Sequence, residues 1–251
     1  MTLRTQRLLV VVAVTAVALM GCSSKSESPA PAPSSPSSSA TAAPQDDSDT
    51  SAAPQDGAVR YLALGDSLSQ GVGAPDEQTG AFPALLAEQW RGAGCEVELQ
   101  NAGISGYTAE QVLTDEVPQI DDFRPTLITF QAGGNDIVSG VTLEEYRQNV
   151  KSVLEAATDS GARVIVLAQN EWFRSPEGKT YGEDLATQRE AFDAAMIEEA
   201  SAAGAEFVDL RPTYKQQADA DQWVEDGIHP TPEAYAAWAG ELAGAVPAPC
   251  Q

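Results

Sequence analysis

The chain contains a single histidine, His229, and an aspartate, Asp226, stands three residues before it. Both lie in the segment Asp-Gly-Ile-His-Pro, where Gly227 permits a tight turn and Pro230 disfavours helix at the histidine. The carboxylate of Asp226 can therefore fold back onto Nδ1 of the imidazole and leave Nε2 free to accept a proton. This spacing predicts a general base that is oriented by a carboxylate.

A base of this kind needs a nucleophile, and Ser67 is the candidate. It follows the apolar run 59–64 in the sequence Leu-Gly-Asp-Ser-Leu-Ser. A serine just beyond the carboxyl end of a central strand lies where open α/β sheets bind their ligands. A serine at this place can also do no more than cap a helix, and position alone does not decide between the two roles.

Donors that could stabilise an oxyanion follow two other apolar runs. Gly103 comes shortly after the run 97–99 and offers a backbone N–H, while Asn135 comes after the run 127–131 and offers a side-chain amide. Glycine and asparagine are ordinary turn residues, so each is weak evidence alone. Because both segments and Ser67 lie just past predicted strand ends, we expect all of them to meet at one edge of a sheet.

Five apolar runs of strand length alternate with helical patterns from Ala58 to the end of the chain. The runs are 59–64, 97–99, 127–131, 164–168 and 206–208, and the helical patterns are 82–90, 109–117, 143–157, 185–203 and the segment from 232. Thr142 and Glu145 open one of these helices with a capping box. The alternation predicts one α/β domain over 58–251, with three layers and a five-stranded parallel sheet in the order 2-1-3-4-5.

Taken together, these segments resemble the four sequence blocks of the SGNH (GDSL-type) hydrolases. Gly65-Asp66-Ser67, Gly103, Gly133-x-Asn135-Asp136 and Asp226-x-x-His229 match those blocks in order, and the longer stretches around them look like the bacterial thioesterase/lysophospholipase branch. The resemblance implies the flavodoxin-like SGNH fold, with Ser67 as nucleophile, His229 as base and Asp226 as its orienting acid. It implies an oxyanion hole made of the N–H groups of Ser67 and Gly103 and the side chain of Asn135. It also implies that no metal or organic cofactor is needed.

The substrate stays open at this level. The resemblance implies a serine esterase for short-to-medium acyl esters, with a carbohydrate O-acetyl esterase, a lysophospholipase or a thioesterase as alternatives. Trp172 and Phe173 follow the fourth predicted strand and either line the substrate site or pack their loop, and the polar segment 174–184 could form a mobile rim. A tethered binding module on an inactive hydrolase scaffold is the alternative from another class, although Ser67, Asn135 and His229 are all present.

The first 57 residues are not expected to belong to the domain. Two arginines, an apolar run over 8–20 and a small residue before Cys22 have the features of a secretory signal. The end Leu-Met-Gly-Cys resembles a bacterial lipobox, which implies a signal peptide at 1–21 and acylation of Cys22, with an ordinary cleaved signal as the alternative. Residues 23–57 contain no Leu, Ile, Val or aromatic residue, so we predict a disordered tether over 22–57. The protein is then exported and held at the outer face of the cell membrane, or secreted.

Charge and cysteine content limit the partners. Acidic residues outnumber basic ones by 37 to 14, a formal net charge of −23, which argues against nucleic-acid binding because phosphates need clustered Lys and Arg. One histidine and three cysteines leave few ligands for a zinc site, and we expect no metal. Cys95 and Cys250 could form a disulfide in an exported protein, with two free thiols as the alternative. We expect a monomer whose partner is a small-molecule or glycan ester.

Overall fold

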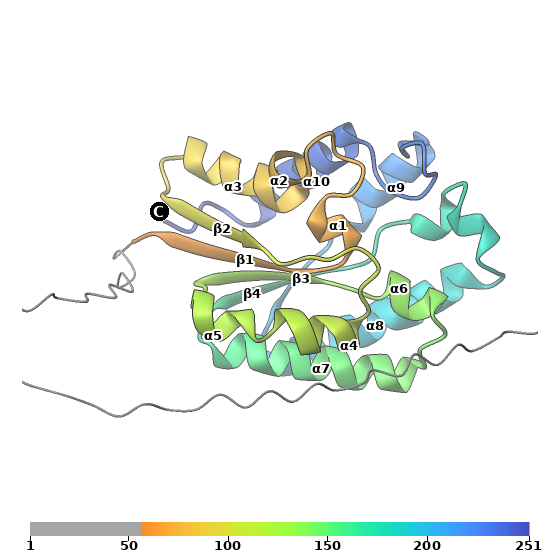
Figure 1. The fold of residues 1–251 in the computed structure, drawn as a ribbon, viewed down its shortest axis with the longest axis horizontal. Helices are drawn as coiled ribbons and strands as arrows, with labels where there is room; N and C mark the ends of the chain where they lie inside the picture. The colour runs from red at the N-terminus through yellow and green to blue at the C-terminus, as the bar shows by residue number, and fades with distance from the viewer. Residues whose placement is uncertain (1–56, 251) are drawn as a thin grey trace, which may run out of the picture. The chain divides into compact units, whose positions relative to one another are not determined.

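Five parallel strands form the centre of the part of the chain that the computed structural model describes, residues 57–250 (Figure 1). They are β1 (Val59–Gly65), β2 (Val97–Asn101), β3 (Leu127–Gln131), β4 (Arg163–Leu167) and β5 (Glu206–Val208). Their order across the sheet is β2-β1-β3-β4-β5, which confirms the predicted topology. The predicted signal peptide (1–21), the acylated Cys22 and the tether (22–57) lie outside the described residues, apart from Gly57, and stay predictions.

The central strands are apolar along their whole length because both faces of the sheet are covered. In β1, Leu62 and Leu64 belong to one hydrophobic core cluster, whereas Tyr61 and Ala63 belong to the other. Successive side chains of a strand point to opposite faces, so a strand between two helical layers shows a continuous apolar run rather than an alternating one. Two cores, one on each face, therefore hold the sheet in place.

Two layers of helices enclose the sheet (Figure 1). One layer contains α1 (Ser67–Gln70), α2 (Glu77–Gly80), α3 (Phe82–Gly92), α9 (Arg211–Asp219) and α10 (Pro232–Ala245). The other contains α4 (Ala109–Gln111), the π-helix η1 (Val112–Glu116), α5 (Gln119–Phe123), α6 (Gly134–Val138), α7 (Leu143–Asp159) and α8 (Leu185–Ala203). Two short 3₁₀ helices, η2 (Trp172–Arg174) and η3 (Gly178–Thr180), follow β4. Together with the sheet these layers confirm the three-layer α/β/α class.

The helices differ from the sequence pattern in several places, and the short helices α2, α5 and α6 lie outside the predicted segments. The segment 109–117, predicted as one helix, is divided between α4 and the π-helix η1. Helix α9 was not predicted, because its sequence is largely polar and buries only Tyr214 and Gln217. Within residues 57–250, no helix combines the length and the hydropathy that crossing a membrane requires.

The capping box predicted for α7 is present. Thr142 Oγ1 accepts a hydrogen bond from the N–H of Glu145 at 3.2 Å, and Glu145 Oε2 accepts one from the N–H of Thr142 at 3.1 Å. Two N–H groups that the helix itself cannot satisfy are thereby paired. Helix α7 therefore begins where the sequence predicts it.

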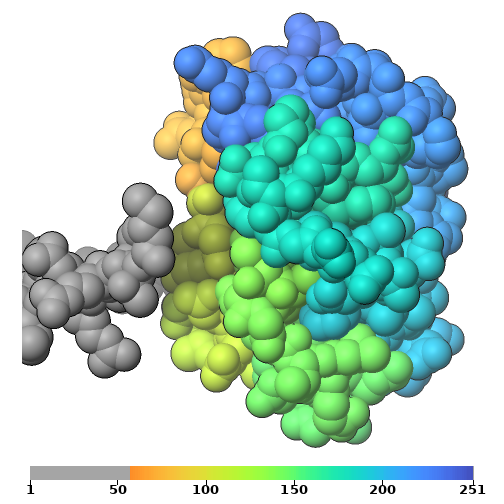
Figure 2. Space-filling model, turned by 90° about the vertical axis from the view of Figure 1, so that its right-hand side faces the viewer, coloured from red at the N-terminus to blue at the C-terminus, as the bar shows by residue number. Residues whose placement is uncertain are grey.

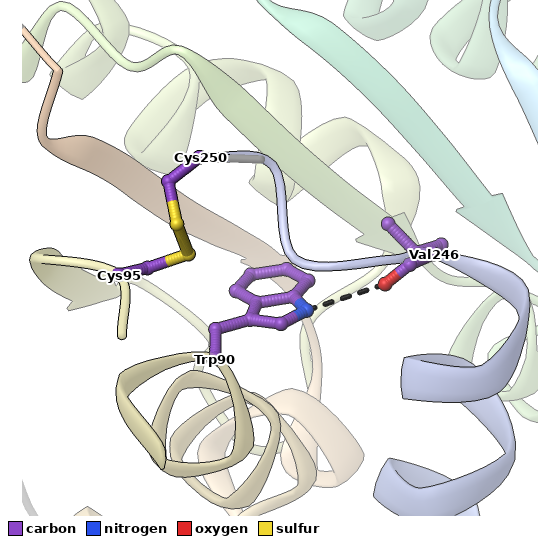
Figure 3. Close-up of a disulfide and its surroundings, with 4 residues drawn as sticks. All are labelled: Trp90, Cys95, Val246 and Cys250. Atoms are coloured by element: carbon purple, nitrogen blue, oxygen red, sulfur yellow. Dashed lines mark hydrogen bonds between the residues drawn. A yellow bond between two sulfur atoms is a disulfide. The ribbon is translucent and has the colours of Figure 1, made fainter. Parts of the chain in front are cut away.

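Cys95 and Cys250 form a disulfide at the amino ends of the strands (Figure 3). Their Cα atoms are 5.6 Å apart, and the bond closes a separation of 155 residues. Beside it, Trp90 Nε1 donates a hydrogen bond to the carbonyl oxygen of Val246 at 3.2 Å. In the chain-entropy model a loop of this length stabilises the fold by roughly 5 kcal/mol. The end of the chain is thus fixed to the turn that precedes β2.

Candidate active site

The carboxyl ends of the strands carry a pocket of about 170 Å³. Ser67, Asn135 and His229 all line it, although they come from α1, α6 and the turn before α10. Figure 2 shows this end of the domain, where the segment after β4 (teal) lies between the segment after β3 (green) and the C-terminal segments (blue). The structure therefore brings together at one place three of the side chains that the sequence singled out.

The turn between β1 and α1 presents Ser67. Asp66 is the N-cap of α1, and its Oδ1 accepts a hydrogen bond from the N–H of Leu68 at 3.0 Å. Gly65 has a φ of +149°, and a Cβ added there would lie 2.6 Å from the carbonyl oxygen of Gln131. Ser67 is the first residue of the helix, so its own N–H has no acceptor inside the helix. The turn holds both the hydroxyl and a free backbone donor at the pocket.

Asp226 folds back onto His229 as the spacing predicted. Its Oδ2 lies 2.6 Å from His229 Nδ1, and its Oδ1 accepts hydrogen bonds from the N–H groups of Ile228 (2.9 Å) and His229 (3.0 Å). Partial burial acts to raise the pKa of Asp226, but these N–H groups and the imidazole outweigh it, so the pKa lies below its usual value. Gly227 makes the turn with a φ of +75°. An ionised carboxylate thus fixes the ring and leaves Nε2 free.

Asn135 is held from two sides. Its Nδ2 donates to the carbonyl oxygen of Tyr107 at 2.9 Å and lies 3.5 Å from Asp66 Oδ2. The next residue, Asp136, is fully buried and accepts the N–H of Ala109 with both carboxyl oxygens at 3.1 Å. Asp136 therefore holds the start of α4 against α6, which keeps the loop around Tyr107 close to Asn135.

The structure corrects the backbone donor predicted after β2. The N–H of Gly103 donates to Asn101 Oδ1 at 3.2 Å, and Gly103 is not among the residues that line the pocket. A Cβ at Gly103 would lie 2.7 Å from Ser69 Cβ, so close packing against α1 explains the glycine. Gly106 lines the pocket, and within residues 57–250 its N–H has no hydrogen-bond acceptor. We therefore replace Gly103 by Gly106 as the candidate donor.

The sequence pattern contained no signal that distinguishes these two glycines. Both lie in the segment 101–106, at the carboxyl end of β2. What separates them is a φ of +86° at Gly106, together with the packing of Gly103 on α1. Neither property can be read from residue types, because both depend on how the loop crosses the helix.

The segment after β4 supplies the far wall of the pocket. Trp172 lines the pocket, and its Nε1 donates to Gln169 Oε1 at 3.0 Å. Phe173 packs against the hydrophobic core instead, with its ring edge-on to Trp172. Tyr181, in the segment predicted as a rim, also lines the pocket and is 42% exposed. Of the two aromatic residues in question, only Trp172 can touch a ligand.

A buried ion pair supports that wall from α8. Arg189 Nε lies 3.1 Å from Asp193 Oδ2, and Arg189 Nη2 donates to the carbonyl oxygen of Gln169 at 2.7 Å. Asp193 Oδ1 accepts from both the N–H and the Nε2 of Gln169. Gln169 is thereby fixed from both ends, and with it the indole of Trp172. Sequence reasoning missed this network because Arg189 and Asp193 lie 20 and 24 residues after Gln169 in the chain.

Cationic groups are absent from the pocket. Within residues 57–250, neither Lys nor Arg lines it, and no cluster of three or more His, Cys, Asp or Glu side chains could hold a metal ion. Asp66 also lines the pocket. Burial raises the pKa of its carboxyl to about 6, although the N–H of Leu68 and the charge of His229 act to lower that pKa. The electrostatic character of the site is therefore neutral to negative.

Comparison with known proteins agrees with this geometry. The model of the GDSL-like lipase/acylhydrolase family matches residues 63–237, a range that contains the candidate residues Ser67, Gly106, Asn135, Asp226 and His229. An arylesterase of Vibrio mimicus is 29% identical over 194 residues, which cover 76% of this chain and 89% of that protein. Thioesterase 1/protease 1/lysophospholipase L1 of Escherichia coli (strain K12) is 30% identical over 182 residues, covering 70% and 78%.

A crystal structure of TesA shares the fold. It superposes with a TM-score of 0.64 at 24% sequence identity, covering 76% of this chain and 99% of the other. The three-layer architecture, the residues at the carboxyl ends of its strands and the family match over 63–237 lead to one conclusion. The chain belongs to the GDSL-like lipase/acylhydrolase family of carboxylic ester hydrolases.

Proposed function

We propose that this protein is a serine esterase in which Ser67, His229 and Asp226 form the catalytic triad. The observation that carries the proposal is the Asp226–His229 pair, joined at 2.6 Å, in a turn that puts the imidazole in one pocket with Ser67. Such a pair orients a base, and a serine at the start of a helix beside it is the nucleophile that the base can activate.

The chemistry proceeds in two halves. Ser67 Oγ attacks the ester carbonyl carbon while His229 Nε2 takes the hydroxyl proton. The tetrahedral intermediate then breaks its bond to the leaving alcohol, which receives that proton from His229, and an acyl-enzyme remains. Water attacks the acyl-enzyme with the same base, and the acid leaves as Ser67 regains its proton. Asp226 stays ionised throughout and stabilises the imidazolium.

Three donors are proposed for the oxyanion: the N–H groups of Ser67 and Gly106 and Nδ2 of Asn135. All three residues line the pocket. In the described structure, Asn135 Nδ2 lies near two acceptors, the carbonyl oxygen of Tyr107 and Asp66 Oδ2. In this proposal one of its two hydrogens is shared between such an acceptor and the substrate oxygen. Preorganised donors of this kind stabilise the charge of the transition state more than the neutral carbonyl of the substrate.

Pocket size supports a short acyl group. A cavity of about 170 Å³ is close to the roughly 150 Å³ that holds one benzene molecule in an engineered protein core. An acetyl to butyryl group fits such a space, whereas a long acyl chain extends past its rim. The preferred substrate in this proposal is therefore an ester with a short acyl chain.

The charge of the site supports a neutral leaving group. Anionic groups such as the phosphates of coenzyme A or of a lysophospholipid meet no Lys or Arg among the described pocket residues, and the chain carries a formal charge of −23. An acetylated glycan is the second candidate, because Tyr181 and Ser105 are exposed at the pocket and offer a ring face and a hydroxyl to a sugar.

A substrate panel tests the proposal. It consists of p-nitrophenyl esters from acetate to palmitate, acetylated xylan, an acyl-coenzyme A and a lysophospholipid, each with wild type and with Ser67→Ala. We expect the highest kcat/KM on short neutral esters, and in the variant a kcat that is lower by roughly four orders of magnitude or more. Equal rates for both proteins, or a preference for the anionic substrates, would refute it.

We also propose that the enzyme is exported and anchored through acylated Cys22. The support is the signal-like sequence before Cys22, together with the disulfide, since disulfides persist in oxidising compartments. Fractionation of the native host tests it. Wild type should partition with membranes and Cys22→Ser should not, and membrane-bound Cys22→Ser protein would refute the anchor.

A further inference from the structure

A buried carboxyl group that the proposed mechanism does not use lies beneath the nucleophile turn. Glu116 is the last residue of the π-helix η1, and its side chain is fully buried. Its Oε2 accepts a hydrogen bond of 2.8 Å from the N–H of Gly65, two residues before Ser67. The carboxyl is therefore bonded to the backbone segment that presents the nucleophile.

Gly65 links this segment to the loop that carries the second proposed oxyanion donor. Its carbonyl oxygen accepts the N–H of Ile104 at 3.2 Å, and Ile104 stands two residues before Gly106. Because Gly65 has a φ of +149° and no room for a Cβ, its position depends on its hydrogen bonds rather than on a side chain. A group that holds the N–H of Gly65 thus fixes two loops relative to each other.

The local helix geometry brings Glu116 to this point. The chain leaves α4 at Gln111 and continues as a π-helix through five residues before α5 begins. Each residue added to a helix turns the following side chains by about 100°. The π-helix therefore decides which side chain of this segment faces Gly65. Such segments are rare and are found frequently at functional sites.

The environment of Glu116 disfavours a negative charge. Burial raises the pKa of Glu116 to about 8, Asp66 and Asp115 raise it too, and the N–H groups of Gly65 and Ile104 act in the opposite direction. The titratable groups that face it are Asp66 on the turn after β1, Asp115 on its own helix and Tyr107 on the loop before α4. Ionisation of any of them adds negative charge.

The stability of the fold does not explain why residue 116 is a glutamate rather than a neutral residue. Within residues 57–250, Glu116 Oε1 has no geometric hydrogen-bond partner, and a buried polar atom without a partner costs free energy. The N–H of Gly65 needs only a neutral acceptor, which a side-chain amide would also supply. Glu116 is thus placed where its hydrogen bond helps the turn and its charge would oppose the oxyanion.

We propose that Glu116 is a positioning residue for ester hydrolysis, which in its uncharged form holds Gly65 and so keeps the Ser67 turn and the Gly106 loop in register. When Glu116 ionises, its negative charge opposes the charge that develops on the substrate oxygen. This inference rests on the proposed esterase function and adds an alkaline limit to it.

Three variants of the full chain test the proposal. Glu116→Gln keeps an acceptor for Gly65 and cannot ionise, whereas Glu116→Leu removes the acceptor. Glu110→Gln is the matched control, since it neutralises an exposed carboxyl on α4 that does not line the pocket. For each variant, kcat and KM on a short neutral ester are measured separately from about pH 6 to about pH 9.5, alongside thermal unfolding.

In wild type and in the control Glu110→Gln, kcat should fall at least about threefold on the alkaline side. Glu116→Gln should keep kcat near pH 7 within about threefold of wild type and lose the alkaline fall. Glu116→Leu should lower kcat at least about tenfold with KM nearly unchanged, because a displaced turn and loop impair the transition state.

Two results would overturn the proposal: kcat of folded Glu116→Leu within about threefold of wild type, or identical alkaline profiles for wild type and Glu116→Gln. If Glu116→Leu does not fold, the pH profile of Glu116→Gln decides alone. Labelling of Ser67 by a fluorophosphonate separates this inference from the proposed function. An unlabelled wild type refutes the esterase, whereas equal labelling rates for wild type and folded Glu116→Leu refute only the role of Glu116.

Discussion

The two ends of the sheet are stabilised by different interactions. At the amino ends of the strands, the Cys95–Cys250 disulfide and the hydrogen bond from Trp90 to Val246 fasten the end of the chain to α3 and β2 (Figure 3). At the carboxyl ends, strands run into glycine turns and buried polar side chains. There, Gln131 Oε1 has no hydrogen-bond partner within residues 57–250.

This difference shows that one end of the sheet contributes mainly to stability, whereas the other end carries the pocket. Apolar packing and a covalent link stabilise the amino end, which contains no part of the pocket. The carboxyl end, which carries the pocket, has a φ of +149° at Gly65 and fully buried acids at Glu116 and Asp136. Substitutions at the two ends should therefore have opposite signatures, in stability at one end and in turnover at the other.

The largest effect is expected at the nucleophile. Ser67→Ala should lower kcat by roughly four orders of magnitude or more, while the melting temperature stays close to that of wild type. Steady-state kinetics on a p-nitrophenyl ester and a thermal melt check both parts. Activity within tenfold of wild type would contradict the assignment of Ser67.

A smaller loss is expected at the oxyanion. Asn135→Ala should reduce kcat about 10²–10³-fold, or roughly 3–4 kcal/mol, with little change in KM, because the amide bonds the charged oxygen better than the carbonyl. Separate kcat and KM values decide the point. A change confined to KM would mean that Asn135 binds the ground state of the substrate.

How far the sequence predicts this end of the sheet differs from residue to residue. Ser67, Asn135, Asp226 and His229 converge as expected, because each follows a strand or lies within one turn of its partner. The predicted donor, Gly103, does not line the pocket, and the proposed donor, Gly106, lies three residues further along the chain. The sign of φ and the packing on α1 that separate these two glycines are not visible in residue types.

The support beneath the site escaped sequence reasoning for a similar reason. A hydrogen bond from Gly65 to a carboxyl 51 residues away depends on how the π-helix packs under β1, and no local pattern marks it. Strand order was easier, because parallel strands joined by helices allow few arrangements and the five apolar runs were distinct.

The amino end should respond in the opposite way. Replacing Cys95 and Cys250 by serine should lower the free energy of unfolding by about 2–5 kcal/mol and leave kcat within about twofold of wild type. Denaturant titration under non-reducing conditions gives the first value, and steady-state kinetics the second. A tenfold loss of kcat without loss of stability would remove the distinction between the two ends.

The smallest effect concerns pH and stability. Burial raises the pKa of Asp136 to about 7 and that of Glu116 to about 8, so the folded state keeps protons that the unfolded chain releases near pH 4. Where the folded state binds more protons, the free energy of unfolding falls as pH rises. The melting temperature should therefore decrease by a few degrees between about pH 5 and about pH 8, and less so in Glu116→Gln. An unchanged slope in that variant would contradict this origin.

Peptide mapping after reaction with a fluorophosphonate tests the central claim most directly. The reagent bonds to an activated serine, and the pocket contains two serines, Ser67 and Ser105. The account predicts an adduct on the peptide with Ser67, none in Ser67→Ala, and undiminished labelling when Cys95 and Cys250 are replaced. An adduct on Ser105, or no adduct on the folded wild-type protein, would contradict it.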